Sequence, residues 1–224
     1  MILTLRGHIR NSFDTLDLFN LVNGIYQLQP DLKIYIHTWD IHANNISWRP
    51  VQGNNNVVTK ELIQNYFGDL SHLIKTILID NDKSISLTGN LNGNVHTSGM
   101  PLVGWKNYWY GNYQVVNAVK ELDSLDPNEM IINTRIDLIT YRPGFFTHQQ
   151  IIDFVKRNIG TIFTKNVFIH DHEAEGIDNI YCGNIDTMYK LAYHFNYHLD
   201  DILADNRFKV HNQEKIVFRV NELI

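Results

Sequence analysis

Hydrophobic and polar residues near the start of the chain alternate in a pattern that predicts a strand, a helix and a second strand. Residues 2–5 form a short apolar run that ends before Gly7. Apolar side chains in residues 13–27 recur at helical spacing, and Pro30 follows that segment. Residues 32–37 are mostly β-branched or aromatic, which is typical of a strand. A crossover of this length favours a parallel pair of strands.

The rest of the chain predicts further strands and helices. Thr59 is a candidate N-cap for a helix that continues to Phe67. Residues 53–56 predict a loop, and residues 89–104, with four glycines, predict a long irregular stretch of the kind that forms lids or binding loops. The tail at 215–220 fits either a strand or a helical turn. The remaining predicted strands are residues 75–79, 130–139 and 166–172, and the remaining helices are 105–122, 147–158 and 186–197.

This order predicts one α/β domain over residues 1–224, with a mostly parallel central sheet flanked by helices. Cys182 is the only cysteine, which excludes an internal disulfide. No apolar run is as long as a membrane span, and residues 1–10 lack the apolar stretch of a secretory signal. We therefore expect a cytoplasmic protein, and peripheral association with a membrane is compatible with this setting.

The charge and composition narrow the class of ligand. The net charge is −5 and only 19% of residues are charged, which argues against a nucleic-acid partner because phosphate backbones require a basic face. Aromatic residues make up 12% of the chain, and asparagine is abundant. Rings and amides suit a neutral, hydroxyl-bearing ligand such as a sugar. An AT-rich genome is an alternative explanation of the same composition.

Polar residues follow several predicted strands, and in sheets of this kind ligands bind beyond the carboxyl ends of the strands. In the first such loop, Gly7 allows close approach of the backbone, and Arg6 or Arg10 could grip a diphosphate by bidentate hydrogen bonds. The alternative is a turn with solvated arginines. The sequence has neither a G-x-G-x-x-G motif nor a G-K-[ST] motif, so a Rossmann cofactor site and a P-loop are excluded.

Three further strand ends carry candidate chemistry. Trp39, after His37, could stack on a base or sugar, or could cap the core. Asp80 and Asp82 form a D-x-D motif that could hold Mg²⁺ or Mn²⁺, although Asp-Asn-Asp is also ordinary turn chemistry. Arg135 and Asp137 lie two residues apart, so in a strand they share a face. Asp137 could then ligate a metal beside Arg135, or the two could form a structural ion pair.

The last polar segments lie between residues 170 and 184. His170 and His172 would share one strand face, as in some metal sites, and Asp171 could act as a general base. The alternative is a polar loop after a short strand. Asn184 or Asp186 is a plausible N-cap of the following helix. The residues around Cys182 form no pattern that would activate its thiol, so we expect an inert, buried cysteine.

Taken together, these segments resemble the nucleotide-sugar glycosyltransferases of the GT-A fold, and among them the compact glycosyltransferases of surface-polysaccharide synthesis. The matching segments occur in the expected order and cover most of the chain. They are residues 5–10, residues 35–39, the helix from Trp105, residues 131–138, residues 178–188, and the pair His211 and Glu214.

The resemblance implies a single GT-A-like domain that moves a sugar from a nucleotide-diphosphate sugar to a glycan or lipid-linked glycan, with help from Mn²⁺ or Mg²⁺. Residues 1–140 would form the nucleotide-sugar half and residues 141–224 the acceptor half. Asp137 would stand where the metal-binding D-x-D of that fold usually ends, with Arg135 in place of its first acid, and the pair Asp80 and Asp82 is the alternative metal site. The residues implied at the nucleotide are Arg6, Gly7, Arg10, His37, Trp39 and Arg135, and those implied at the sugar or acceptor are Trp105, Asn179, Gly183 and Asn184.

Glycosyl transfer requires neutralisation of the leaving diphosphate and, in an inverting reaction, a carboxylate base. Asp171 and Asp178 are the candidate bases. Two other functions stay open from the sequence. One is a metal-dependent phosphoester hydrolase, which the His170 and His172 pair suggests. The other is a non-catalytic carbohydrate-binding protein, which the aromatic and asparagine content suggests.

Overall fold

The computed structural model describes residues 1–47, 52–122, 125–140, 144, 146–169 and 179–224. Its strands are β1 (Ile2–Arg6), β2 (Lys33–Trp39), β3 (Ile41–Ala43), β4 (Asn54–Val57), β5 (Ile74–Asp80), β6 (Ile131–Arg135), β7 (Phe168–Ile169) and β8 (Ile180–Gly183). Its helices are α1 (Asp17–Leu28), α2 (Lys60–Phe67), the 3₁₀ helix η1 (Gly68–Leu73), α3 (Leu102–Lys120), α4 (His148–Asn158), α5 (Ile185–Ala204) and α6 (Gln213–Leu223).

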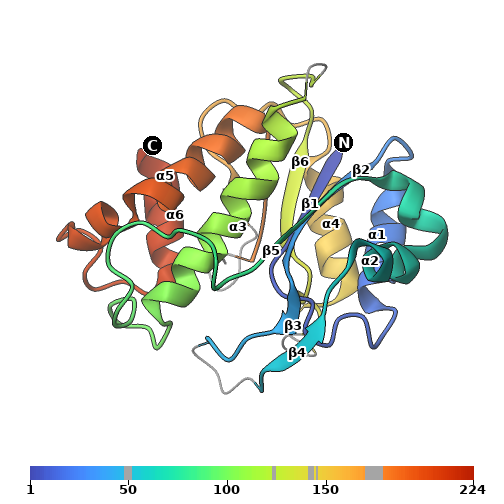
Figure 1. The fold of residues 1–224 in the computed structure, drawn as a ribbon. Coiled ribbons are helices and arrows are strands. Elements are labelled where there is room, and N and C mark those ends of the chain that lie inside the picture. Colours follow the sequence, from blue (N-terminus) through green and yellow to red (C-terminus); the bar gives the residue numbers. More distant parts are fainter. Residues whose placement is uncertain (48–51, 123–124, 141–143, 145, 170–178) are drawn as a thin grey trace.

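A six-stranded sheet in the order β5-β2-β1-β6-β8-β7 forms the centre of the molecule. The four strands β5, β2, β1 and β6 are parallel, whereas β8 runs antiparallel to both β6 and β7. A separate antiparallel hairpin, β3 and β4, lies beyond the carboxyl end of β2 (Figure 1). The predicted fold class, α/β with a mostly parallel sheet flanked by helices, is confirmed.

Helices cover both faces of the sheet. α1, α2 and α4 lie on one side of it, and α3, α5 and α6 lie on the other (Figure 1). Each side has its own hydrophobic core, because strand residues point alternately to the two faces. In β1, Leu3 and Leu5 belong to the core on the α1 side, so Ile2, Thr4 and Arg6 face α3.

The face of the sheet that meets α3 changes from apolar to polar along the strands. At the amino ends, Ile2, Tyr35 and Ile131 are buried in the core on that side. At the carboxyl ends, the register places Arg6 beside His37 on β2 and beside Arg135 on β6. The same three strands therefore supply core packing at one end and polar chemistry at the other.

Side-chain caps fix the starts of several helices. Thr59 accepts a hydrogen bond from the backbone N–H of Leu62, as its predicted role as the N-cap of α2 requires. Thr147 forms a capping box with Gln150 at the start of α4. Asn184 caps α5 in the same way with Thr187. These local signals explain why the predicted helices form close to their predicted positions.

Several elements differ from the sequence-based expectations or extend them. Residues 53–56 were predicted as a loop, but Asn54–Val57 is β4, which is stabilised by pairing with β3 and not by local strand propensity. The strand predicted at 130–139 ends at Arg135. Ile180–Gly183 is a strand, β8, which the sequence pattern did not predict. The tail is a helix, α6, and α5 continues to Ala204 past a non-helical residue at His198.

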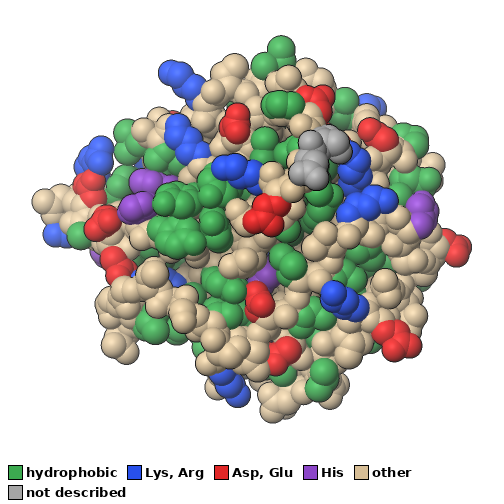
Figure 2. Space-filling view, turned by 45° about the horizontal axis from the view of Figure 1, so that its top comes forward, with side chains coloured by type: hydrophobic (Ala, Val, Ile, Leu, Met, Phe, Trp, Pro, Cys, Tyr) green, Lys and Arg blue, Asp and Glu red, His purple; other side chains and the backbone are tan. Residues whose placement is uncertain are grey.

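One face of the molecule carries mixed charge. Figure 2 shows basic and acidic side chains interspersed over the face that it draws. In the part of the chain that the structure describes, none of the helices combines the length and hydrophobicity that a membrane crossing requires.

Candidate active site

A pocket opens at the carboxyl ends of β1, β2 and β6, on the side that α3 covers. Three arginines line it: Arg6 at the end of β1, Arg10 in the loop that follows, and Arg135 at the end of β6. We call it the arginine pocket. Its interior is about 100 Å³, which is room for a few water molecules. A ligand as large as a nucleotide sugar would therefore extend through the mouth.

Arg6 is buried, with 2% of its surface exposed. Its Nε donates a hydrogen bond to Asn133 Oδ1 at 2.7 Å, and its Nη2 donates to the hydroxyl of Tyr108 at 2.6 Å. The guanidinium carbon also lies 4.0 Å from the centre of the Tyr108 ring, a cation–π contact. Strand β6 and helix α3 thus hold this cation at the wall of the pocket.

Asp137 joins the other two arginines. Arg135 donates two parallel hydrogen bonds to its carboxylate, from Nε to Oδ1 and from Nη2 to Oδ2, each 2.7 Å long. Arg10 Nη1 lies 3.3 Å from Oδ2. Burial raises the pKa of Asp137, but the positive charges of Arg135 and Arg10 outweigh it, and the pKa lies below its usual value. Asp137 is therefore ionised and orients two of the three arginines.

The loop between β1 and α1 has an unusual backbone. Gly7 adopts φ 98°, which a side chain would disfavour, and Arg10 adopts φ 53°, the left-handed region. The N–H of Arg10 donates to the carbonyl of His42 at 2.8 Å, which ties the loop to β3. A non-glycine residue in the left-handed region is often found where function requires a side chain at that place. Here the backbone conformation turns Arg10 back toward Asp137.

A stack of rings forms another wall. His8 stacks on Trp39 with ring centres 5.8 Å apart, and Trp39 stacks on Tyr110 at 6.0 Å. His8 and Trp39 line the pocket. Burial, and then the charge of Arg10, lower the pKa of His8 to about 3, so its imidazole is neutral at physiological pH.

His37 lies behind this stack and does not line the pocket. Its ring is buried and meets Trp39 edge to face at 5.1 Å, and its Nε2 lies 3.1 Å from Asp80 Oδ2. Tyr110 donates to the same carboxylate oxygen at 3.0 Å. A side chain at Gly111 would place its Cβ 2.8 Å from His37 Nδ1. Because Gly111 has no side chain, α3 can pack directly on His37.

Each predicted metal ligand that the structure describes, Asp80, Asp82 and Asp137, has a protein partner. Asp137 is held by two guanidinium groups, Asp80 by His37 and Tyr110, and Asp82 Oδ2 accepts a hydrogen bond from Asn44 at 2.6 Å. The pKa of Asp80 lies below its usual value, chiefly because of the hydrogen bond with His37. Among the residues that the structure describes, no three His, Cys, Asp or Glu side chains form a group that could hold a metal ion.

The structure brings together about half of the predicted site residues. Those that line the arginine pocket are Arg6, Gly7, Arg10, Trp39, Trp105, Arg135, Asp137 and Asn179. Asn179 Oδ1 accepts a hydrogen bond from Arg135 Nη1 at 3.3 Å. The predicted residues that are not part of the pocket lining are His37, Asp80, Asp82, Gly183 and Asn184. The candidate bases Asp171 and Asp178, and the pair His170 and His172, lie outside the described residues.

Two of the residues outside the pocket have a role in packing. The side chain of Asn184 is occupied as the N-cap of α5, and its amide donates to the carbonyl of Phe163 at 3.0 Å. A Cβ at Gly183 would lie 2.4 Å from Thr187 Oγ1, so the glycine makes room for that cap. Cys182 is buried and burial raises the pKa of its thiol to about 12, as an inert cysteine requires.

Several pocket residues were not predicted as site residues, among them His8, Asn107, Tyr108 and Gln213. His8 sits between the predicted Gly7 and Arg10. Asn107 and Tyr108 come from α3, and Gln213 is the first residue of α6. An asparagine and a tyrosine within a mostly apolar helical pattern were the available signal for α3, whereas Gln213 reaches the pocket only through tertiary packing.

Comparison with known proteins yields similarity at the level of structure. No protein-family model matches the sequence, and no curated protein matches it either. An active-site mutant of LgtC is similar over 99% of this chain and 70% of its own, with 11% identity and a TM-score of 0.43. The galactosyltransferase LgtC in complex with donor and acceptor sugar analogues covers the same shares, with 12% identity and a TM-score of 0.42. Values this low say nothing about the residues of the pocket, so the fold class stands on the sheet and helices themselves.

Proposed function

We propose that this protein is a glycosyltransferase that moves a sugar from a nucleotide-diphosphate sugar to a glycan acceptor. The observation that carries the proposal is the meeting of Arg6, Arg10 and Arg135 in one pocket of a chain whose net charge is −5. Elsewhere charges of both signs are interspersed over the face in Figure 2. A concentration of guanidinium groups at the carboxyl ends of parallel strands suits a diphosphate.

The chemistry of glycosyl transfer explains why arginines belong there. The bond between the sugar and the diphosphate breaks, and negative charge develops on the leaving oxygen. Fixed cations close to that oxygen stabilise the transition state, and they need no reorganisation at the moment of reaction. Arg6 is fixed by Asn133 and Tyr108, and Arg135 is fixed by Asp137. Asp137 is in this proposal a positioning residue for Arg135 and Arg10.

Other parts of the reaction extend the proposal. The base that activates the acceptor hydroxyl would be Asp171 or Asp178. The amino-terminal part, to about residue 140, would bind the donor, and the remainder would bind a growing glycan or a lipid-linked glycan in polysaccharide synthesis. The proposed setting is the cytoplasm, because a chain whose only cysteine is Cys182 cannot form an internal disulfide and suits a reducing compartment. Mn²⁺ or Mg²⁺ stays a prediction, and we derive no step through it because the described carboxylates have other partners.

Calorimetric titration with UDP, GDP, ADP and dTDP tests the proposal, each with and without Mn²⁺ and beside the matching monophosphate. We expect one diphosphate to bind more tightly than its monophosphate. Arg135→Gln should weaken that binding at least tenfold, since it removes a charge-assisted contact. The control is Arg219→Gln, an exposed arginine that pairs with Glu222 at 3.0 Å on α6. It should leave binding unchanged.

A transfer assay then uses the glucose conjugate of the bound nucleotide and measures release of the diphosphate with a mixture of oligosaccharide acceptors. Binding of no nucleotide by the wild-type protein would overturn the proposal. Hydrolysis of p-nitrophenyl phosphate without any sugar donor would favour the phosphoester hydrolase instead.

A further inference from the structure

Several buried polar side-chain atoms lack a hydrogen-bond partner among the described residues, and four of them belong to neutral side chains that line the arginine pocket. These four are Nε2 of His8, Nε1 of Trp105, Oδ1 of Asn107 and Oε1 of Gln213. Buried polar groups in native proteins are nearly always paired, because water lost on burial must be replaced. Such a cluster at one pocket therefore marks groups that a ligand would pair.

These four groups come from three separate parts of the chain. His8 follows β1, Trp105 and Asn107 lie on α3, and Gln213 begins α6. Trp105, Asn107 and Gln213 are 0%, 6% and 8% exposed, so their missing partners must come from a molecule inside the pocket. We call these four residues the neutral wall. They contrast with the arginines on the strand ends.

The chemistry of the neutral wall selects one kind of ligand. Trp105 can only donate a hydrogen bond, the amide oxygens of Asn107 and Gln213 only accept, and His8 does one or the other according to its tautomer. A phosphate offers only acceptors and would repel the two amide oxygens. An apolar ligand would leave all four atoms without partners. A sugar hydroxyl both donates and accepts, so a group with several hydroxyls meets every requirement.

We propose that the neutral wall binds the hydroxyl groups of the transferred sugar, while the arginines bind its diphosphate. This inference rests on the proposed function, because it assigns the second half of the same donor molecule. His8 is partly buried, and its pKa is lowered to about 3, so it is neutral at physiological pH and the wall carries no charge. The wall thus determines which sugar the pocket accepts.

The test compares the affinity of the protein for a nucleoside diphosphate and for its glucose, galactose and N-acetylglucosamine conjugates. The variants are His8→Phe, which keeps a ring to stack on Trp39, Asn107→Leu and Gln213→Leu. Each should reduce the preference for the best conjugate over the bare diphosphate about fivefold, which is the worth of one hydrogen bond. Affinity for the bare diphosphate should stay unchanged.

Thr38→Val is the matched control. Thr38 is fully buried, its Oγ1 also lacks a partner among the described residues, and it does not line the pocket. The valine should leave both affinities unchanged. Thermal unfolding gives a second readout, because replacing an unpaired buried polar atom by an apolar one stabilises the empty protein. Asn107→Leu should therefore raise the unfolding temperature while it lowers the preference for the conjugate. Gln213→Leu also loses the hydrogen bond from Nε2 to Glu214 Oε1, so its readout is the preference alone.

The results separate this inference from the proposed function. If the wild-type protein binds a diphosphate and the three pocket variants keep the wild-type preference for the conjugate, the neutral wall does not bind the sugar. Lower unfolding temperatures together with an unchanged preference would also overturn it, because the four groups would then be structural. Absence of diphosphate binding in the wild type overturns the proposed function, and this inference with it.

Discussion

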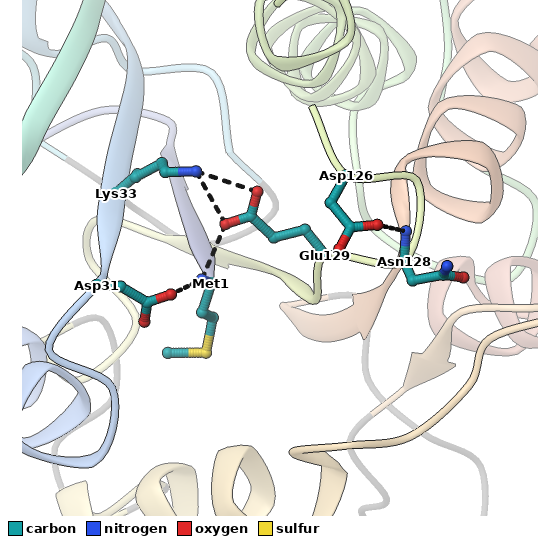
Figure 3. A network of polar contacts seen from close by, with 6 residues as sticks. All are labelled: Met1, Asp31, Lys33, Asp126, Asn128 and Glu129. Atoms are coloured by element: carbon teal, nitrogen blue, oxygen red, sulfur yellow. Dashed lines mark hydrogen bonds and ion pairs between the residues drawn. The ribbon is translucent and has the colours of Figure 1, made fainter. Parts of the chain in front are cut away.

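Charged side chains interact with one another at both ends of strands β1, β2 and β6, but the two networks differ. At the amino ends, Glu129 accepts hydrogen bonds from Lys33 at 3.1 and 3.2 Å, and the amino group of Met1 contacts Glu129 and Asp31 (Figure 3). At the carboxyl ends, three arginines surround a pocket together with Asp137.

The difference between the two ends lies in how completely their polar groups are paired. In the network of Figure 3, each described cation contacts a carboxylate, and no buried side-chain atom there lacks a partner. Four buried atoms of neutral side chains in the lining of the arginine pocket have no partner among the described residues. Charges that pair fully contribute to holding strands together, whereas groups with unmet hydrogen bonds are suited to a ligand. The degree of pairing of the polar groups therefore distinguishes a structural network at one end from a candidate binding site at the other.

The largest effect is expected from Asp137→Asn. This change removes the carboxylate that Arg135 and Arg10 share inside the protein, and breaking a buried ion pair costs about 3–5 kcal/mol. Urea unfolding monitored by tryptophan fluorescence measures the loss. Asp137→Glu, which keeps the charge, should lose less. A stability equal to that of the wild type would show that the ion pair does not hold the pocket together.

Arg10→Gln should weaken binding of the preferred nucleoside diphosphate about 10- to 100-fold, because a hydrogen bond to a charged group contributes about 1.5–3 kcal/mol. The paired control is Lys33→Gln at the other end of the same sheet, which should leave affinity unchanged. Calorimetric titration measures both. Equal losses in the two variants would mean that the net charge of the protein, and not the pocket, attracts the ligand.

Acid should destabilise the protein through His8. The unfolded chain takes up a proton at His8 near its ordinary pKa of 6.5, whereas in the folded protein burial lowers the pKa to about 3. The unfolded state thus binds more protons between these values, and stability falls as the pH falls from about 6.5 toward 3. Between pH 7 and pH 5 the loss should be about 1–2 kcal/mol.

Urea titrations at both pH values, on the wild type and on His8→Phe, isolate this contribution. The variant lacks the titrating group, so its stability should fall less over the same interval. An equal fall in both proteins would place the sensitivity elsewhere, for example at His194, whose pKa is also lowered by burial.

The smallest effect is expected from Lys33→Gln at the amino ends, where Glu129 keeps its contact with the amino group of Met1. Lys33 is partly exposed, and such pairs contribute at most about 1 kcal/mol. Urea unfolding should show a loss within that range, with no change in diphosphate affinity. A loss as large as that of Asp137→Asn would remove the distinction between the two ends of the sheet.

Local sequence patterns were sufficient for much of the fold. The first strand, helix and second strand, and the cap at Thr59, follow from hydrophobic spacing and from one side-chain hydrogen bond. β4 did not follow, because Asn54–Val57 has poor strand propensity and is held by pairing with β3. β8 is four residues long and depends on β6. Strands that are stabilised by pairing with a distant segment are hard to predict from their own residues.

The site was predictable where chemistry follows a strand directly. Arg6, Arg10 and Arg135 were found because the carboxyl ends of parallel strands meet at one edge of a sheet. Asn107 and Gln213 were missed, since a residue on a helix reaches the pocket only if the helix packs at the right angle and height. The charged part of the pocket can thus be predicted from residues at strand ends, whereas the neutral wall can be recognised only in the tertiary structure.

Gly111 has a consequence beyond its own contact with His37. The missing Cβ, which would lie 2.8 Å from His37 Nδ1, sets how near α3 lies to the sheet. Tyr108 is almost one turn before Gly111, and Asn107 lies four residues before it. The width of the gap between the arginines and the neutral wall is therefore fixed by a residue that itself does not line the pocket. A methyl group at that position would act as a spacer, and the size of ligand that the gap admits would change without any change in the residues that line it.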